Sequence, residues 1–351
     1  MSNSKNKSNS KAALLARQVE HIDITSFDAE PIIAAMEKMS FSSRDLGRAT
    51  RIYKNMLADP DCTVILTLAG STSAGGCMDL YADLLRYNMV DCVVSTGASI
   101  VDMDFFEGLG FKHYHAEGAV DDEELRALYI DRIYDTYIDE EELQACDFTI
   151  HEIADAMEPG PVSSRRVIKE MGRHLVEKGK KDNSLVRIAY EKDIPIFCPA
   201  FSDSSAGFGL VKHQVERIKA GKPYLSIDSV ADFRELTEIK IEAGTTGLLM
   251  VGGGVPKNFA QDTVVCAEIL GHDDVEMHKY AVQITVADVR DGACSSSTLK
   301  EACSWGKVSP VEEQMVFAEA TTVLPLLASS AYHAGAWKGR PEKRLARRFE
   351  D

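Results

Sequence analysis

Cysteine pairs, membrane-length apolar runs and a secretion signal are all missing from this sequence. The eight cysteines form no Cys-x-x-Cys pair, so we expect reduced thiols, several of them as small core residues. No apolar stretch is long enough to cross a membrane, and Met1 to Lys11 lacks the apolar segment of a signal peptide. These absences predict a soluble, cytoplasmic protein.

Metal ligands and positive charge are also scarce. His113 and His115 form the only close histidine pair, with no third ligand nearby in sequence, so no metal site is expected. Lysine and arginine number 39 against 55 acidic residues, which gives a net charge of −16. This balance argues against a nucleic-acid partner and is compatible with small cationic substrates.

Much of the negative charge lies between Asp121 and Asp147. Leu125, Leu128 and Ile133 recur there at helical spacing. A solvated helix face and a funnel for a cationic substrate both explain the pattern, and the sequence leaves the two open.

Five short apolar runs, each leading to a loop of small residues, form the main structural pattern. The runs are 63–68, 92–94, 195–198, 247–251 and 281–284, and the loops include 69–76, 95–99, 203–207, 252–254 and 291–294. Such runs without clean alternation are typical of parallel strands buried on both faces. Ligands bind at the carboxyl ends of such strands. We predict an α/β fold, a Rossmann-like parallel sheet with helices on both faces, and a nucleotide site at one edge.

Two predicted helices have residues that mark where they begin or end. Ser229 with Asp232 resembles a capping box, and Gly244 offers a stop. Leu80 and Leu84 mark a helix that follows the first glycine-rich loop directly. The free amides at the start of that helix would favour a phosphate.

The segment from Glu301 to Lys307 holds a candidate amine nucleophile. Burial of Lys307 against Trp305 would disfavour the ammonium and leave free base for Schiff-base chemistry. The alternative is a lysine stem that lies on the ring with its charge in water.

Six ordered motifs between about residue 45 and residue 330 resemble the deoxyhypusine synthase family. They are Asn88-Met89-Val90-Asp91 with Ser95-Thr96-Gly97, Pro199-Ala200-Phe201-Ser202-Asp203, Gly252-Gly253-Gly254-Val255-Pro256-Lys257, Asp291-Gly292 and Ser304-Trp305-Gly306-Lys307. The resemblance implies a Rossmann-like domain, a homotetramer, and NAD at sites shared between paired subunits. With it we expect a flexible segment over 1–20, one NAD-binding domain over 21–335, and a basic tail over 336–351 that packs on an acidic neighbour or stays loose.

The resemblance also implies a covalent mechanism. NAD takes hydride from the amine-bearing carbon of a polyamine, Lys307 captures the imine, an acceptor amine displaces the lysine, and the hydride returns. Carried over by position, Lys307 is the nucleophile, Trp305 shapes its pocket, and Glu301 is a retained substrate acid. The expected NAD contacts are Thr96, Gly97, Asp102, Asp203, Gly252, Gly253, Ala287, Glu319 and Ala320. Glu319 departs from the family, which usually has aspartate there.

The expected substrate residues depart further from the family. Phe208 and Cys294 stand where the family has acids, Asn258 replaces a histidine, and Asp291 begins the Asp-Gly motif. A desolvated ammonium without a carboxylate is costly, so spermidine in the family's pose is doubtful. A planar guanidinium could instead stack on Phe208.

Four functions follow from this comparison. The leading hypothesis is a 1,9-bis(guanidino)-5-aza-nonane synthase that condenses two agmatines and releases ammonia. The alternatives are a homospermidine synthase using putrescine or spermidine, a deoxyhypusine synthase acting on a translation-factor lysine, and an NAD-binding sensor without transferase chemistry.

Overall fold

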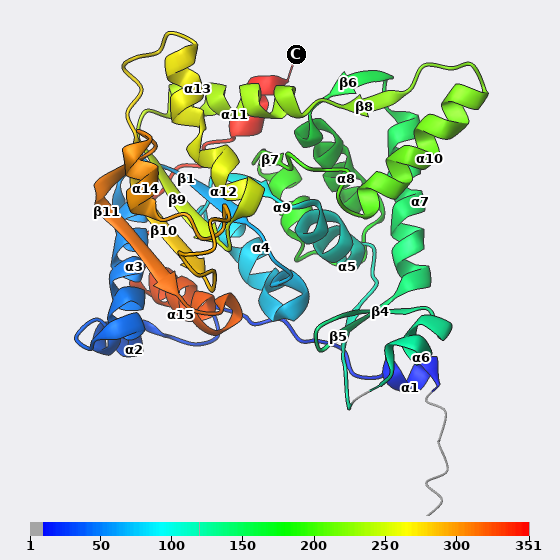
Figure 1. Ribbon diagram of the computed structural model, residues 1–351, viewed down its shortest axis with the longest axis horizontal. Coiled ribbons are helices and arrows are strands. Elements are labelled where there is room, and N and C mark those ends of the chain that lie inside the picture. Colours follow the sequence, from blue (N-terminus) through cyan, green and yellow to red (C-terminus); the bar gives the residue numbers. More distant parts are fainter. Residues whose placement is uncertain (1–9, 119, 351) are drawn as a thin grey trace, which may run out of the picture.

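The computed structural model describes residues 10–118 and 120–350, and its centre is a six-stranded parallel sheet (Figure 1). The strand order is β11-β10-β9-β1-β2-β7, and every neighbouring pair is parallel. The strands are β1 Thr63–Leu68, β2 Cys92–Ser95, β7 Ile196–Phe197, β9 Thr246–Val251, β10 His278–Thr285 and β11 Val308–Phe317. The predicted fold class is confirmed, and the five predicted strands lie where the apolar runs are.

Helices account for most of the remaining chain. Their bounds are α1 Lys11–Leu14, α2 Glu30–Met36, α3 Phe41–Ala58, α4 Met78–Arg86, α5 Phe106–Gly108, α6 Asp122–Ala127, α7 Glu140–Ala156, α8 Ser164–Lys178, α9 Leu185–Glu191, α10 Ser205–Lys219, α11 Ser229–Ala243, α12 Gly254–Gln261, α13 Thr263–Ile269, α14 Leu299–Ser304 and α15 Ala320–Ala334. Two π-helical turns, η1 Ser73–Cys77 and η2 Ala98–Phe105, follow β1 and β2, and the 3-10 turn η3 Leu345–Phe349 lies near the C-terminus. Within the part of the chain described, no helix has the length and apolar character needed to cross a membrane.

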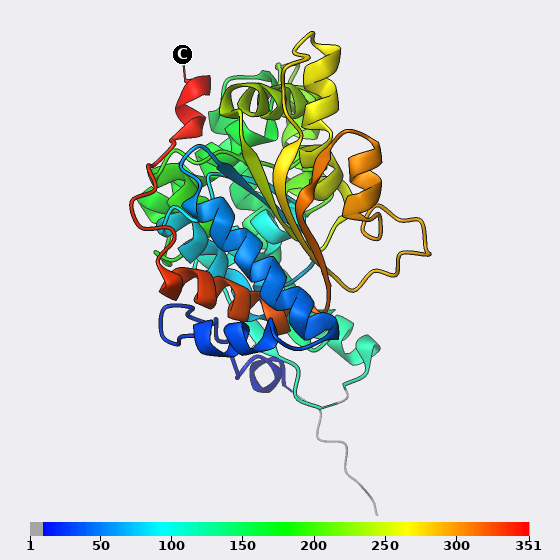
Figure 2. The same cartoon turned by 90° about the vertical axis from the view of Figure 1, so that its left-hand side faces the viewer.

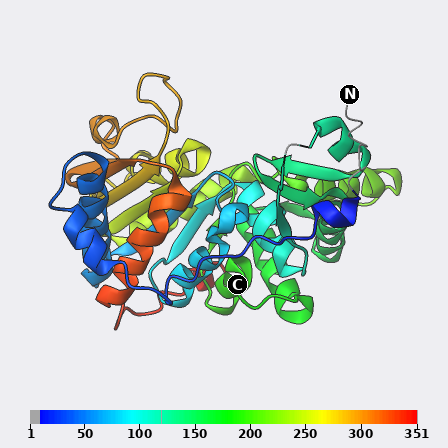
Figure 3. The same ribbon diagram turned by 90° about the horizontal axis from the view of Figure 1, so that it is seen from below.

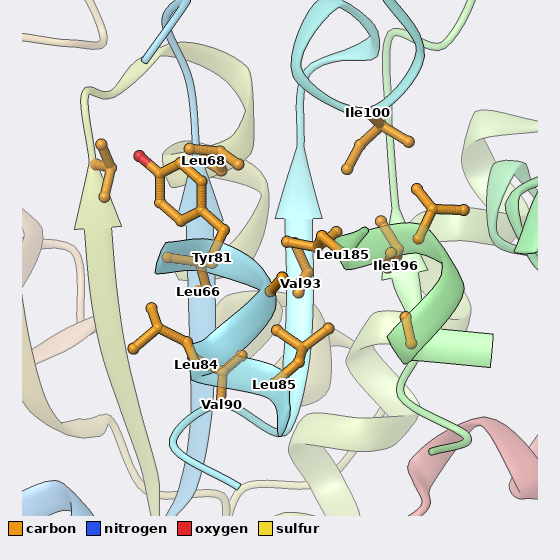
Figure 4. Packing of buried hydrophobic residues seen from close by; sticks show 14 of the residues in the cluster. Leu66, Leu68, Tyr81, Leu84, Leu85, Val90, Val93, Ile100, Leu185 and Ile196 are labelled. Carbon is orange, nitrogen blue, oxygen red and sulfur yellow. The ribbon is translucent and has the colours of Figure 1, made fainter. Parts of the chain in front are cut away.

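Alternate residues of the strands separate two hydrophobic layers. Leu66 and Leu68 of β1 face one layer, where Tyr81, Leu84 and Leu85 of α4 pack on the sheet (Figure 4). Helices α3 and α15 complete this layer, while α11, α12 and α14 pack on the other face. Figure 2 shows α3 and α15 on one side of the strands and α14 on the other. Because both faces are covered, the central strands are apolar throughout, as expected for a parallel sheet.

A small antiparallel sheet lies at the end of the molecule opposite α14. Its order is β3-β5-β4, with β3 His113–His115, β4 Ile130–Ile133 and β5 Thr136–Asp139. The helical spacing read across 125–133 was therefore wrong beyond α6, because the chain turns at Tyr129 and Tyr134, which have φ angles of 55° and 50°. The Ile, Tyr and Thr residues that follow favour a strand pair.

The N-terminal part of the chain crosses the molecule from this small sheet to α2 (Figure 3). Gln18 bridges to Tyr114, and Val19 N donates to His113 O at 2.9 Å. Of the segment predicted to be flexible, residues 1–9 lie outside the described residues, residues 11–14 form α1, and Arg17 and Val19 hydrogen-bond to β3. His113 itself turns to Glu107, with Nδ1 2.8 Å from Oε1.

Two local expectations need correction. The N-cap of α11 is Asp228, whose side chain accepts from Val230 N and Ala231 N, so the cap begins one residue before Ser229. Asp232 instead turns into the core, where Ser164 Oγ donates to it at 2.9 Å. Gly244 ends the helix with a φ of 62°, as predicted.

The strand β11 was missed altogether. Its middle carries Pro310, Glu312 and Glu313, and it is an edge strand with much of its length exposed. An edge strand lacks the continuous apolar run by which the other strands were recognised.

The basic tail is fixed by one buried arginine. Arg340 Nη2 lies 2.6 Å from Asp91 Oδ2, and both side chains are 3% exposed. The same guanidinium donates to the carbonyls of Met56, Leu57 and Cys62. The tail thus packs on an acidic partner, one of the two arrangements predicted.

We expect Arg340→Met to lower the free energy of unfolding by about 3–5 kcal/mol, because it leaves the Asp91 carboxylate buried without its partner. Arg344→Met removes an exposed pair with Asp193 and should cost less than about 1 kcal/mol. Urea unfolding of both variants measures the difference. Equal, small losses would show that the buried pair contributes no more than a surface one.

Candidate active site

The loops after the parallel strands enclose two adjoining cavities. The larger, of about 400 Å³, lies over the ends of β1, β9, β10 and β11, and the smaller, of about 150 Å³, lies over the ends of β2, β7 and β9. Ala69, Gly253 and Ser295 line both. The predicted cofactor residues gather here: Gly252, Gly253, Ala287, Glu319 and Ala320 line the larger cavity, and Thr96, Gly97, Asp203 and Gly253 line the smaller.

Glycines bring the walls of these cavities together. Gly252 has a φ of 72°, and a Cβ there would lie 3.0 Å from Ala69 O. A Cβ on Gly253 would lie 2.4 Å from Ser295 Cα, and one on Gly97 would lie 2.4 Å from Ser204 Oγ. Gly252 and Gly253 lie against the backbone of other loops, and Gly97 lies against the Ser204 side chain, so these positions require glycine for steric reasons.

Glu319 begins α15 at the edge of the larger cavity. Its carboxylate caps the helix, accepting from Thr321 N at 3.0 Å and Thr322 N at 3.1 Å. Burial alone would raise the pKa of Glu319, but the hydrogen bonds from Thr321 and Thr322 lower it. The longer side chain, which departs from the family, still performs an N-cap function.

Asp102 is the one predicted cofactor residue that lines neither cavity. It lies in η2, where its Oδ1 accepts from Ser205 N, the first residue of α10, at 2.8 Å. Burial raises the pKa of Asp102 to about 6. This carboxyl therefore joins the loop after β2 to the start of α10.

Lys307 follows α14 and meets α12 and the start of α13. Its Nζ pairs with Asp262 and lies 3.5 Å from Asn258 Oδ1. The Trp305 ring centroid is 5.3 Å from the same Nζ, but Trp305 is 69% exposed. The expected burial of the amine by Trp305 is therefore wrong for the chain on its own: the lysine side chain is 12% exposed because the neighbouring helices cover it.

Glu301 caps α14. Its Oε2 accepts from Thr298 N at 2.5 Å and from Thr298 Oγ1 at 2.8 Å, which completes a capping box. The backbone hydrogen bond from Thr298 lowers the pKa of Glu301. Its expected role toward a substrate stays a prediction.

The sequence missed a buried lysine beside the site. Lys257 is 1% exposed, and its Nζ donates to Ser297 Oγ at 2.9 Å, to Cys294 O at 3.3 Å and to Ser297 O. Burial lowers the pKa of Lys257 to about 8. The lysine holds the loop that carries Asp291 and Cys294, both exposed, and Ser295 of this loop forms a wall of the two cavities.

Asp262 was also missed. It lies four residues after Asn258, at the spacing that puts two side chains on one helix face, and Asn258 Nδ2 donates to its Oδ2 at 2.8 Å. That spacing was the available signal. For Lys257 the signal in the sequence was weaker, because its partners lie in a distant loop and two of the three are backbone carbonyls.

Phe208 lies apart from the other predicted substrate residues. It is 70% exposed on the first turn of α10 and lines a cavity of about 690 Å³. Helices α10 and α14 lie toward opposite ends of the longest axis (Figure 1). One chain therefore does not bring Phe208 and Lys307 together.

Lys257→Met should release the loop over residues 286–298, because it removes three hydrogen bonds from one buried donor. We expect its amide hydrogens to exchange at least about tenfold faster, as expected for a segment with lower local stability. Hydrogen exchange followed by mass spectrometry measures this. Lys300→Met, at an exposed position of α14, is the matched control; unchanged exchange in Lys257→Met would contradict the assigned role.

Comparisons with known proteins point to one family. A family model described as deoxyhypusine synthase matches residues 31–331. Proteins named deoxyhypusine synthase-like protein from Coxiella burnetii (strain RSA 493) and Caulobacter vibrioides are each 69% identical, over 97% of this chain and 96% and 93% of theirs. The crystal structure of a protein assigned as a deoxyhypusine synthase of Entamoeba histolytica has 20% identity and a TM-score of 0.59, and it covers 90% of this chain and 97% of that one. At this identity it shows the fold alone.

Proposed function

Because the chain belongs to the deoxyhypusine synthase family, whose members are transferases, we propose that it moves an aminoalkyl group between small amines with the help of NAD and a lysine imine. The observation that carries the proposal is that the small-residue loops line two adjoining cavities. Helix α12 begins at one of these loops, and its Asn258 contacts Lys307, the proposed amine nucleophile. The leading substrate is agmatine.

The cavities fit a dinucleotide cofactor. Gly97, Gly252 and Gly253 line the cavities and carry no side chain into them, because a Cβ at these positions would collide with neighbouring loops, and Ser295 lines both cavities. Bound there, NAD would accept a hydride from the amine-bearing carbon of the donor and later return it. Thr96 and Asp203 would supply polar contacts, and Glu319 would hold α15 at the cavity edge.

Lys307 would carry the transferred group. Its amine attacks the oxidised carbon of the donor, ammonia leaves, and a carbon–nitrogen double bond joins the lysine to the group. The primary amine of a second substrate then displaces Lys307 and takes over that double bond. Asn258 and Asp262 would hold and orient the lysine between these steps.

The substrate is inferred from the charges present. Phe208 and Cys294 provide no carboxylate for an ammonium, whereas an exposed aromatic face suits a planar, weakly hydrated guanidinium. Transfer of a guanidinobutyl group from one agmatine to another would release ammonia and give 1,9-bis(guanidino)-5-aza-nonane. Homospermidine synthesis from putrescine or spermidine is the second candidate, because Glu301, in the segment that leads to Lys307, remains an acid. Acceptance of a translation-factor lysine is the third, and a sensor without transfer chemistry would leave Lys307 without a role.

A complete site requires a second copy of the chain. Support comes from the separation of α10, which carries Phe208, from α14, which precedes Lys307. A paired copy could bring its Lys307 to the α10 end of this chain, in keeping with the homotetramer expected from the family resemblance.

Lys307→Arg should lower product formation at least about a thousandfold while NAD binding stays near normal, because arginine keeps the charge but cannot form the imine. Borohydride trapping followed by peptide mapping should label Lys307 in the parent protein. Lys300→Arg is the matched control. Turnover by Lys307→Arg at a near-native rate would exclude the covalent route.

Gly253→Ala should weaken NAD binding by at least about tenfold, because the new methyl displaces the backbone of Ser295. Gly271→Ala, at an open position with positive φ outside the cavities, tests for general strain. Titration calorimetry with NAD measures both variants. Equal affinities would mean that the cofactor does not bind against Gly253.

The substrate is tested by mass spectrometry of products from agmatine, putrescine and spermidine, each incubated with NAD. The double variant Phe208→Asp with Cys294→Asp should shift relative catalytic efficiency toward putrescine or spermidine by roughly ten- to a hundredfold, because ammonium groups regain charge partners. Equal loss with all amines would indicate a damaged pocket. A parent protein that ignores agmatine but makes homospermidine would reject the guanidinium argument.

A further inference from the structure

Phe208 lines a cavity of about 690 Å³ whose other residues have no role in the steps described above. It lies among α6, β4, α7 and α10, and its size is within the usual range for small-ligand sites. The residues around it are Asp122, Leu125, Arg126, Ile130, Asp131, Arg132, Glu140, Leu143, Gln144, Asp147 and Phe208. It combines acidic groups with apolar surface.

The acidic groups are not all neutralised. Arg132 forms a two-pronged pair with Asp122, Nε to Oδ1 and Nη2 to Oδ2 both at 2.9 Å. That pair leaves the carboxyls of Asp131, Glu140 and Asp147 against the single guanidinium of Arg126. Burial, followed by the neighbouring charges of Glu140 and Asp139, raises the pKa of Asp131. The cavity therefore has an excess of negative charge that a cation would relieve.

Asp147 of α7 lines this cavity together with Phe208 of α10. A Cβ on Gly209 would lie 2.4 Å from Asp147 O, so the first turns of α10 pack directly on α7 at this residue. Oδ1 of Asp147 is buried and has no hydrogen-bond partner among the described residues. Burial raises the pKa of Asp147 to about 6, although the Ser205 hydroxyl opposes the shift. Asp147 is half-buried, and none of the ion pairs among the described residues includes it.

We propose that this cavity binds the guanidinium end of the amine substrate, with Asp147 as its charge partner and Phe208 as its stacking face. The proposal rests on the transfer function above and adds the residue that determines specificity. Position 208 itself carries no acid, and Asp147 supplies a carboxylate from the neighbouring helix. A guanidinium is planar and weakly hydrated, so it loses less hydration free energy than an ammonium does when it moves from water into a partly apolar cavity.

The connection to the cofactor loops runs through the start of α10. Ser205 N donates to Asp102 Oδ1 at 2.8 Å, and the Ser205 hydroxyl opposes the rise in the pKa of Asp147. Asp203, two residues before Ser205, lines the smaller cofactor cavity. The guanidinium end would be held on one side of this turn, and the reacting amine end would lie toward the other. A four-carbon arm separates the two ends of agmatine.

The experiment measures agmatine binding by titration calorimetry in the full-length Lys307→Arg protein with NAD present, so that no transfer product forms. Adding Asp147→Asn should weaken agmatine binding by about tenfold or more, because a charged hydrogen bond is lost. Adding Glu152→Gln, which removes one charge from the same helix outside the cavity, should leave binding unchanged. Adding Phe208→Leu should weaken agmatine binding more than putrescine binding.

Two results separate this proposal from the transfer function. If the parent protein makes product from agmatine but Asp147→Asn binds agmatine as tightly as Glu152→Gln does, the cavity is not the guanidinium site and the transfer function stands. If Lys307→Arg binds agmatine in an Asp147-dependent way while the parent forms no product and no trapped Lys307 adduct with any amine, the cavity stands and the transfer function fails. Absence of agmatine binding in Lys307→Arg would overturn the cavity assignment.

Discussion

Close backbone approach at the carboxyl ends of the parallel strands is the constraint on which the site depends. A Cβ on Gly253 would collide with the Ser295 backbone, and one on Gly97 would collide with the Ser204 side chain. Because the loops pack this closely, Ala69, Gly253 and Ser295 line both cavities, and both cavities lie over the carboxyl ends of the strands. Lys257 then holds the wall in place from behind, through carbonyls of the loop that contains Ser295.

Much of the fold could be read from the sequence because buried parallel strands are apolar along their whole length. That signal located β1 and β9 and the loops after them, whereas the individual cofactor residues were carried over from the family resemblance. It failed for β11, where Glu312 and Glu313 lie on a partly exposed edge strand. It failed again at β4, where a short apolar spacing was compatible with both helix and strand.

The parts of the site that the sequence did not reveal depend on contacts between distant segments. Lys257 donates to backbone carbonyls some forty residues away, and such partners cannot be recognised from residue identity. Asp147 gained significance only when α7 and α10 were seen to enclose a cavity with Phe208. Lys307 and Trp305 were recognised in the sequence, but the exposure of Trp305 in one chain was not predicted, because burial of its ring would need a surface that the chain alone does not provide.

Because Phe208 and Lys307 lie far apart in one chain, the central claim is that each active site forms between two copies. Mixing two inactive variants tests this claim. Lys307→Arg lacks the nucleophile, and Phe208→Arg puts a repelling cation at an exposed position of the α10 end. If each site takes Lys307 from one copy and Phe208 from the other, subunits exchanged in equal amounts should recover about a quarter of parental activity, since half of the pairs are mixed and each mixed pair has one intact site. Activity no higher than the sum of the two variants alone, with exchange verified by native mass spectrometry, would contradict the claim.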